Sequence, residues 1–143
     1  MHEDGSRGEA RETERSDRAL VVIVDDDASV RQSTCRLIRS FGHRAESFAS
    51  GAEFLRSEIA ERADCLVLDV RMPDMSGLEV QRLLSERGAR IPILFITGRA
   101  SEQEEQRACA AGAAAFLRKP VSQAMLRQAL DDVLPASGRE RRS

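Results

Sequence analysis

The residues best suited to chemistry in this sequence are a few acids, one hydroxyl and one ammonium group, each close to the end of an apolar run. Asp25, Asp26 and Asp69 follow runs of valine, isoleucine and leucine. Thr97 ends another run, and Lys119 follows a fourth. Lys119 is also the only lysine among the 22 Lys and Arg residues of the chain. Arginine carries its charge on a planar guanidinium, whereas the ammonium of lysine is a compact, flexible point charge. The composition of the chain favours arginine, so the lysine at this one position calls for an explanation.

Three carboxylates that converge on one place repel each other and require a compensating charge. At a separation of about 4 Å and an effective dielectric constant of about 20, each like-charged pair costs on the order of 4 kcal/mol. A small divalent cation offsets this repulsion, and Mg²⁺ suits a site with one or two direct carboxylates, several waters and a phosphate oxygen. The ammonium of Lys119 and the hydroxyl of Thr97 would hold the remaining phosphate oxygens. This set of groups favours phosphoryl chemistry, in which a protein mainly positions groups and neutralises charge.

Each of these residues, taken alone, also has a purely structural explanation. An acidic run after a strand often caps the next helix, threonine is a good strand former, and one lysine can be a solvated surface residue. For any one of these residues considered alone, the structural explanation is favoured. Their joint placement reverses that balance, because ligands bind beyond the carboxyl ends of parallel strands. His2 and His43 are not placed to form a competing His/Ser or Cys/His pair.

Five short apolar runs, bounded by turn residues, predict the strands that position these groups. They cover residues 20–25, 45–48, 65–70, 93–97 and 114–117, with helical periodicity between them. The runs are apolar almost throughout, which indicates a sheet that is covered on both faces, and helical crossovers indicate parallel pairing. The sequence therefore predicts a doubly wound α/β domain with five strand–helix units.

Serine and glycine residues mark the expected ends of the helices. Three helices are expected to begin with a capping box, in which a serine hydroxyl and a glutamate three residues later satisfy backbone N–H groups. These boxes are Ser50/Glu53, Ser76/Glu79 and Ser101/Glu104. Three helices are expected to end at a glycine suited to the left-handed backbone conformation. These glycines are Gly42, Gly88 and Gly112.

Length and composition predict one globular domain with a polar segment at each end. The chain has 143 residues, of which 41% are hydrophobic and 32% charged. Residues 1–18 are too poor in apolar side chains to pack, so we expect a disordered tail there, a domain over 19–135 and a second disordered tail over 136–143. No apolar run has the length of a signal peptide core or a membrane span, which favours a cytoplasmic protein without a membrane partner.

Charge and cysteine content argue against nucleic-acid-binding, disulfide-rich and zinc-binding proteins. The net charge of -2 and the scattering of arginines among acids, without aromatic partners, argue against direct binding of nucleic acid. Cys35, Cys65 and Cys109 lack the spacing of a disulfide framework or a zinc site. We expect all three to be small core residues.

Four segments together resemble the response-regulator receiver domain of two-component signalling systems. They are "VVIVDDD", "CLVLDVRMPDMSGLE", "ILFITG" and "AAAFLRKP", and the resemblance runs from about Leu20 to Leu134. The segments "LDVRMPDMSGLE" and "FITG" are most similar to those of the FixJ-type branch, whose members usually carry a helix-turn-helix output domain. The resemblance implies a flavodoxin-like (βα)5 fold with the strand order 2-1-3-4-5.

The resemblance also implies roles for the acidic residues. Asp69 would be the phosphoacceptor, which takes a phosphoryl group from a histidine kinase or from a small acyl phosphate. Asp26 would bind Mg²⁺ directly and Asp25 mostly through water. Asp69 itself and the backbone carbonyl of Arg71 would complete the protein ligands.

The resemblance further implies that the remaining site residues respond to phosphorylation. Thr97 would bond a phosphate oxygen once Asp69 is modified, and Phe116 would swing inwards to fill the space that is vacated. Lys119 would pair with the phosphate. Its bond to Pro120 is expected to be cis, which would turn the lysine back over the strand ends.

The simplest functional expectation is a stand-alone receiver, because only "PASGRERRS" follows Leu134. Its partners would be a sensor histidine kinase or phosphotransfer protein and a downstream protein target, and a phosphorylation-dependent homodimer is also open. It would not be an enzyme apart from Mg²⁺-dependent self-phosphorylation on Asp69 and the hydrolysis of that phosphate. The alternative is the receiver half of a FixJ-type helix-turn-helix transcription regulator. A phosphohydrolase of the haloacid dehalogenase type is disfavoured, because it needs a second aspartate where this chain has Arg71.

Overall fold

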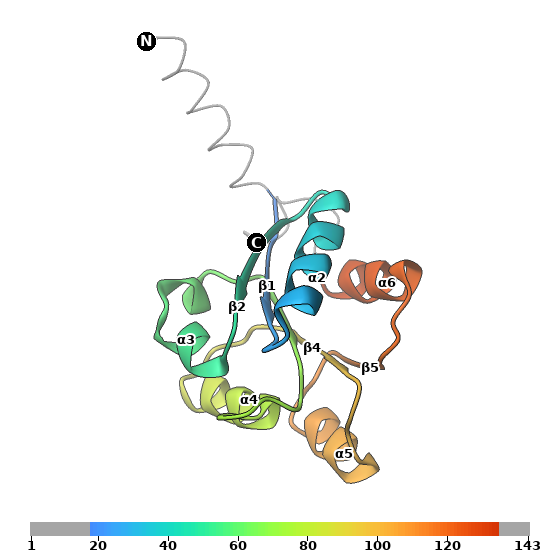
Figure 1. Ribbon diagram of the computed structural model, residues 1–143. Helices are drawn as coiled ribbons and strands as arrows, with labels where there is room; N and C mark the ends of the chain where they lie inside the picture. Colours follow the sequence, from blue (N-terminus) through green and yellow to red (C-terminus); the bar gives the residue numbers. More distant parts are fainter. Residues whose placement is uncertain (1–17, 135–143) are drawn as a thin grey trace.

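A five-stranded parallel sheet forms the centre of the computed structural model, which describes residues 18–134 (Figure 1). The strands are β1 (Leu20–Val24), β2 (Arg44–Phe48), β3 (Cys65–Leu68), β4 (Ile93–Thr97) and β5 (Ala115–Arg118). Their order in space is β2-β1-β3-β4-β5, and each neighbouring pair is parallel. The expected doubly wound fold and strand order are confirmed. The tails expected over 1–18 and 136–143 lie outside the described residues, apart from Arg18.

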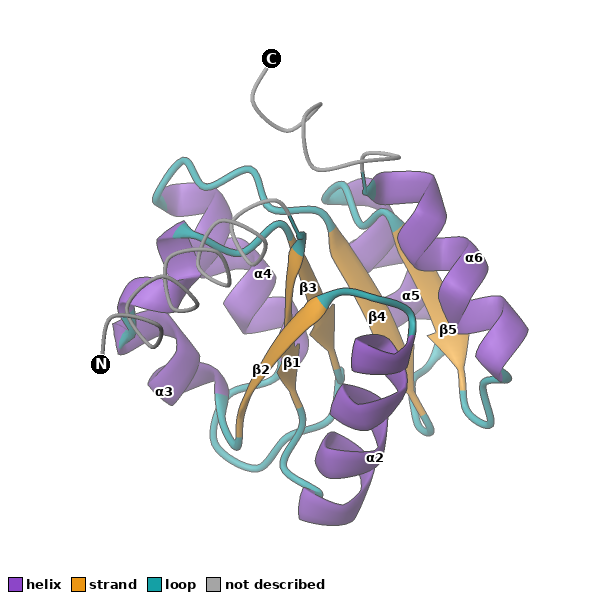
Figure 2. Cartoon of the chain, turned by 90° about the horizontal axis from the view of Figure 1, so that it is seen from above, coloured by secondary structure: helices purple, strands orange, loops and turns teal. Residues whose placement is uncertain are grey.

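The helices cover both faces of this sheet, as the continuous apolar runs predict. They are α2 (Ala28–Ser40), α3 (Gly51–Arg56), the short 3-10 helix η1 (Glu58–Glu61), α4 (Gly77–Glu86), α5 (Glu102–Ala110) and α6 (Gln123–Val133). Helices α2 and α6 lie on one face, and α3, α4 and α5 lie on the other (Figures 1 and 2). Each face therefore has its own apolar core.

Strand β1 shows why two cores form. Leu20, Val22 and Val24 belong to the core beneath α3, α4 and α5, whereas Val21 and Ile23 belong to the core beneath α2 and α6. Successive side chains of a strand point to opposite faces, so a strand that is buried on both faces must be apolar at every position. All five residues of β1 are buried.

The three predicted serine caps are present, but only one forms a complete capping box. The hydroxyls of Ser50, Ser76 and Ser101 each accept a hydrogen bond from the backbone N–H three residues later. The carboxylate of Glu104 also accepts from the N–H of Ser101, which completes the box. Glu53 instead accepts from the N–H of Ala49, one residue before the cap.

The three expected glycine ends are confirmed. Gly42, Gly88 and Gly112 have φ angles of 99°, 78° and 101°. A side chain is strained in this left-handed region, and each glycine follows the last turn of a helix.

The structure differs from the sequence-based prediction at several boundaries. The strands expected over 20–25 and 65–70 end earlier, because the chain turns into loops once the parallel ladder ends at Val24 and Leu68. Helix η1 was not expected. Cys109 was expected in the core, and that expectation is wrong, since it is exposed. Its neighbour Ala108 is the buried residue of α5, and adjacent helix positions point in different directions.

Gly77 lets α4 begin directly against the loop that carries Asp69. A Cβ atom at position 77 would collide with the backbone carbonyl oxygen of Asp69 and lie 3.1 Å from the ring of Phe95. We expect Gly77→Ala to destabilise the protein by about 1–3 kcal/mol, because neither neighbour can move without shifting the core. Urea unfolding measures this loss.

A matched control is Gly98→Ala, where a Cβ would meet only the flexible side chain of Lys119, at 3.7 Å. This variant should stay within about 0.5 kcal/mol of the wild type. Equal stability losses in the two variants would show that the close approach at Gly77 is not the cause.

Candidate functional site

Three carboxylates meet at the carboxyl ends of neighbouring strands. Asp25 and Asp26 directly follow β1, and Asp69 directly follows β3. One carboxylate oxygen from each lies within 4.8 Å of the others. Asp25 and Asp69 are buried, with 5% and 8% of their surface exposed, whereas Asp26 is exposed. The fold thus brings together acids that are far apart in the sequence, with one open side facing solvent.

The ammonium group of Lys119 lies between two of these carboxylates. Its Nζ is 3.4 Å from Oδ2 of Asp25 and 3.3 Å from Oδ2 of Asp69. Its backbone N–H donates to the carbonyl of Thr97 at 2.8 Å, which ties the end of β5 to the end of β4. The bond between Lys119 and Pro120 is cis, as expected. Burial lowers the pKa of Lys119, but the charges of Asp69 and Asp25 outweigh that effect and leave the pKa raised.

The environment of Asp25 disfavours its charge. Burial raises the pKa of this carboxyl group above its usual value, and the negative charge of Asp69 adds to the effect. A hydrogen bond from the N–H of Asp27 to Oδ1, at 2.9 Å, and the charge of Lys119 act in the opposite direction without cancelling the rise. A second positive charge among these oxygens would therefore favour the ionised form.

Asp27, the third of the consecutive aspartates, caps a helix. Asp27 is the N-cap of α2, and its side chain accepts hydrogen bonds from the N–H groups of Ser29 and Val30 at 3.0 and 3.2 Å. Arg31, which sequence reasoning missed, donates to the backbone carbonyl of Asp25 at 2.7 Å. The first turn of α2 thereby fixes the loop that presents the acids.

Thr97 is fully buried, and its hydroxyl is bonded within its own loop. It donates to the carbonyl of Arg99 at 2.8 Å and accepts from the N–H of the same residue at 3.2 Å. Among residues 18–134, no hydrogen bond joins this hydroxyl to Asp69. Phe116 is partly buried, with its ring centre 5.7 Å from that of Phe95. The two predicted switch residues therefore lie on the neighbouring strands β4 and β5.

Arg71 connects the loop after β3 to helix α5. Its backbone N–H donates to Oδ1 of Asp69 at 3.1 Å, and its guanidinium forms an ion pair of 2.9 Å with Glu104. The pKa of Glu104 is lowered, first by the backbone hydrogen bond from Ser101 and then by the charge of Arg71. Sequence reasoning expected the backbone carbonyl of Arg71 as a ligand, but it did not find this ion pair.

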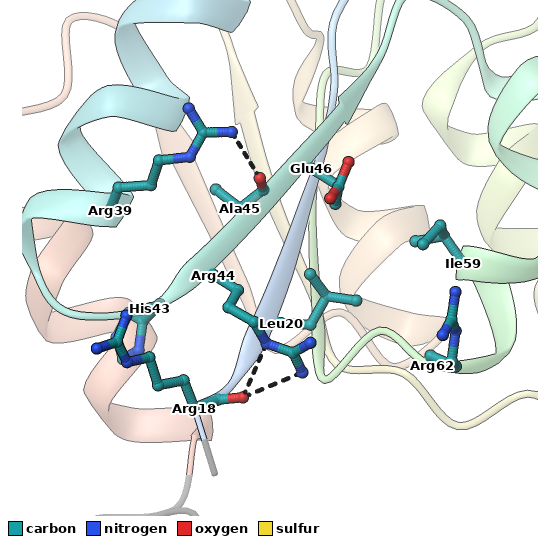
Figure 3. A pocket seen from close by; sticks show the side chains of 9 residues that line it. All are labelled: Arg18, Leu20, Arg39, His43, Arg44, Ala45, Glu46, Ile59 and Arg62. Atoms are coloured by element: carbon teal, nitrogen blue, oxygen red, sulfur yellow. Dashed lines mark hydrogen bonds between the residues drawn. The ribbon is translucent and has the colours of Figure 1, made fainter. Parts of the chain in front are cut away.

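A hollow of about 520 Å³ lies away from these acids and contains none of them (Figure 3). Its lining residues are Arg18, Leu20, Arg39, His43, Arg44, Ala45, Glu46, Ile59 and Arg62. Two of its arginines donate to backbone carbonyl groups near the starts of β2 and β1. Arg39 donates to the carbonyl of Ala45, and Arg44 donates to that of Arg18 (Figure 3). A structural role explains these contacts, so the acidic cluster is the candidate site.

Within residues 18–134, the helices are all too short or too polar to cross a lipid bilayer.

Comparison with known proteins finds a matching family. The family model described as "Response regulator receiver domain" matches residues 21–131. Nodulation protein W of Bradyrhizobium diazoefficiens is 42% identical over 136 residues, which make up 95% of this chain but 59% of that protein. The chain thus spans little more than half of the length of this curated relative.

Two solved structures have the same fold. Chemotaxis protein CheY4 of Vibrio cholerae is 33% identical, with a TM-score of 0.75, and the match covers 82% of this chain and 99% of that one. The structure titled FixJ-N is 34% identical, with a TM-score of 0.74, and the match covers 82% of this chain and 97% of that one. The similarity therefore covers nearly the whole of both of these smaller chains.

Proposed function

Since the chain belongs to the response regulator receiver domain family of two-component signalling, we propose that it is phosphorylated on Asp69 and signals by phosphorylation-dependent binding to another protein. We place the receiver over residues 19–135. The observation that supports this most directly is the position of Lys119, whose ammonium lies between the carboxylates of Asp25 and Asp69. Receiver domains are signalling modules and not an enzyme family.

The proposed reaction is a phosphoryl transfer to a carboxylate oxygen of Asp69. An oxygen of Asp69 attacks the phosphorus of a phosphohistidine or a small acyl phosphate, a new O–P bond forms, and the bond to the donor breaks. Lys119 then neutralises one phosphate oxygen and Thr97 turns to bond another. Because burial already disfavours negative charge at Asp25, the added phosphate needs these cationic and hydrogen-bonding partners.

The acidic cluster fits Mg²⁺. Receiver domains generally bind this ion at an acidic pocket, and the donor set here consists of oxygen atoms, which Mg²⁺ prefers. Asp25, Asp26 and Asp69 would hold the ion together with the backbone carbonyl of Arg71. When bound, it would neutralise the carboxylates and the phosphate oxygens during transfer.

Mg²⁺ is expected to stabilise the folded protein by an amount that grows with its concentration. At ten times the dissociation constant, the free energy of unfolding should rise by about 1.4 kcal/mol. Scanning calorimetry is the suitable measurement, because the chain has no Trp and no Tyr.

Asp26→Asn provides the control for this prediction. Asp26 is exposed, so the variant should fold as stably as the wild type without Mg²⁺ and lose most of the stabilisation that the ion gives. A melting temperature of the wild type that does not respond to millimolar Mg²⁺ would count against the metal site.

Incubation with a small acyl phosphate and Mg²⁺ tests the proposed function itself. Intact-mass analysis should find one added phosphoryl group, and omission of Mg²⁺ should prevent the addition. Candidate histidine kinases can then be ranked by their rate of transfer, which would identify the partner that supplies the phosphoryl group.

A second candidate is the receiver half of a FixJ-type helix-turn-helix transcription regulator. The length of the curated relative, of which the chain covers 59%, favours this possibility, and so does the similarity to FixJ-N. The sequences next to this one in its source genome distinguish it from a stand-alone receiver. In both cases the chemistry proposed for Asp69 is the same.

A further inference from the structure

Arg118, the last residue of β5, makes three contacts that the proposed chemistry does not use. Its Nη1 donates to the backbone carbonyl of Ala100 at 2.8 Å, and its Nη2 forms an ion pair of 2.8 Å with Glu105. Its guanidinium carbon also lies 5.5 Å from the centre of the Phe116 ring. A single side chain thus joins β5 to the loop between β4 and α5 and to the first turn of α5.

This loop is the segment that would have to rearrange after phosphorylation. The hydroxyl of Thr97 exchanges two hydrogen bonds with the backbone of Arg99, so it can turn towards a phosphate only when these bonds break. Ala100 is the next residue, and its carbonyl is the acceptor for Arg118. A loop that releases the hydroxyl of Thr97 therefore moves the atom that Arg118 holds.

Two ion pairs from different strand ends hold the start of α5. Glu105 pairs with Arg118 from the end of β5, and the adjacent Glu104 pairs with Arg71 from the loop after β3. Glu104 also completes the capping box with Ser101. The loop is consequently held by its own cap and by two arginines from different strand ends.

We propose that Arg118 is a positioning residue that holds the β4–α5 loop in the observed arrangement and so sets the cost of turning Thr97 towards a phosphoryl group. This inference rests on the proposed phosphorylation of Asp69. Arginine suits the task, because its planar fork bonds two acceptors at once while it lies over an aromatic ring. Removal of the side chain should increase the fraction of molecules in the competent arrangement, and the apparent affinity for a phosphoryl mimic should rise by the same factor.

The test is a titration with beryllium fluoride and Mg²⁺, a mimic of the phosphoryl group on a carboxylate, followed by the amide spectrum of the whole chain. We expect Arg118→Gln to bind the mimic roughly three- to tenfold more tightly than the wild type, the range that one ion pair and one hydrogen bond can supply. Without the mimic, the amide signals of Thr97 and Ala100 should already be displaced towards their positions in the mimic-bound wild type.

Arg82→Gln is the matched control. Arg82 forms an exposed ion pair of 2.6 Å with Glu86 within α4, and in the described part of the chain no hydrogen bond or ion pair joins it to the β4–α5 loop. This variant should bind the mimic like the wild type. Arg118→Lys, which keeps the charge without the fork, should fall between the wild type and Arg118→Gln.

Three outcomes would count against one or both proposals. Equal affinities of Arg118→Gln and the wild type, or weaker binding by the variant, would overturn the role of Arg118. Tighter binding of the mimic by Arg82→Gln than by the wild type would also overturn the role of Arg118, because the rise in affinity would then follow from the loss of any surface ion pair. Failure of the wild type to bind the mimic would instead overturn the proposed function, and the inference with it.

Discussion

Asp69→Asn is expected to reduce phosphoryl uptake from an acyl phosphate or a kinase to the background level. An amide oxygen is a poor nucleophile, and the substitution also removes one of the three carboxylates that would hold the metal ion. The modification of the wild type should be stable in acid and cleaved by hydroxylamine, as expected for an acyl phosphate. Intact-mass analysis at matched times measures the effect.

Asp27→Asn supplies a closely matched control for this result. Asp27 belongs to the same acidic run, but its side chain caps α2, and asparagine is an equally good N-cap. We expect this variant to be phosphorylated at nearly the rate of the wild type. Uptake by Asp69→Asn at the rate of the wild type would mean that another residue is the acceptor.

Lys119→Arg is expected to uncouple phosphorylation from the conformational change although the charge is retained. The ammonium fits between Asp25 and Asp69 as a compact point charge, whereas the bulkier guanidinium presents a fixed fork of donors. A phosphate that contacts Lys119 only in the active arrangement shifts the population towards that arrangement. Loss of this contact should weaken the coupling about tenfold or more, a typical size for such energies.

The measurement compares the amide spectra around Thr97 and Phe116 at equal occupancy of Asp69. The wild type should change on phosphorylation, and Lys119→Arg should change far less. Lys119→Ala is the control for metal binding, because removing a cation beside three acids should leave the affinity for Mg²⁺ at least as high. If Lys119→Arg gave the same spectral change as the wild type, the single lysine would be an accident of composition.

The sequence predicted the strands, the helices and their parallel arrangement because these depend on local patterns, and the resemblance to receiver domains supplied the strand order. Apolar runs, serine caps and terminal glycines are readable without tertiary information, and the parallel order then places Asp25 and Asp69 at one edge of the sheet. The capping boxes show the limit of this reasoning. The pattern at Ser50 is the same as at Ser101, yet Glu53 turns to the backbone of a different residue.

The contacts that the sequence could not predict join residues from different elements. The pairs Arg71–Glu104 and Arg118–Glu105 depend on how the loops after β3 and β4 pack, and the chain offers many other arginines and acids as partners. Cys109 was placed wrongly for a similar reason. Its position on α5 is set by which side of the helix faces the sheet, and the short apolar pattern of that helix does not specify this.

The central position of β1 also bears on the order in which the strands pair as the chain folds. β1 pairs with β2 and β3 within residues 20–68, whereas β5 joins the sheet last, at its edge beside β4. Contacts between segments that are close in sequence form at a lower entropic cost, so we expect β1 to pair with β2 and β3 before β5 adds to the sheet. In that order of events Asp25 and Asp69 come together before the ammonium of Lys119 reaches them. We therefore expect Mg²⁺ to support the partly folded sheet until Lys119 is in place.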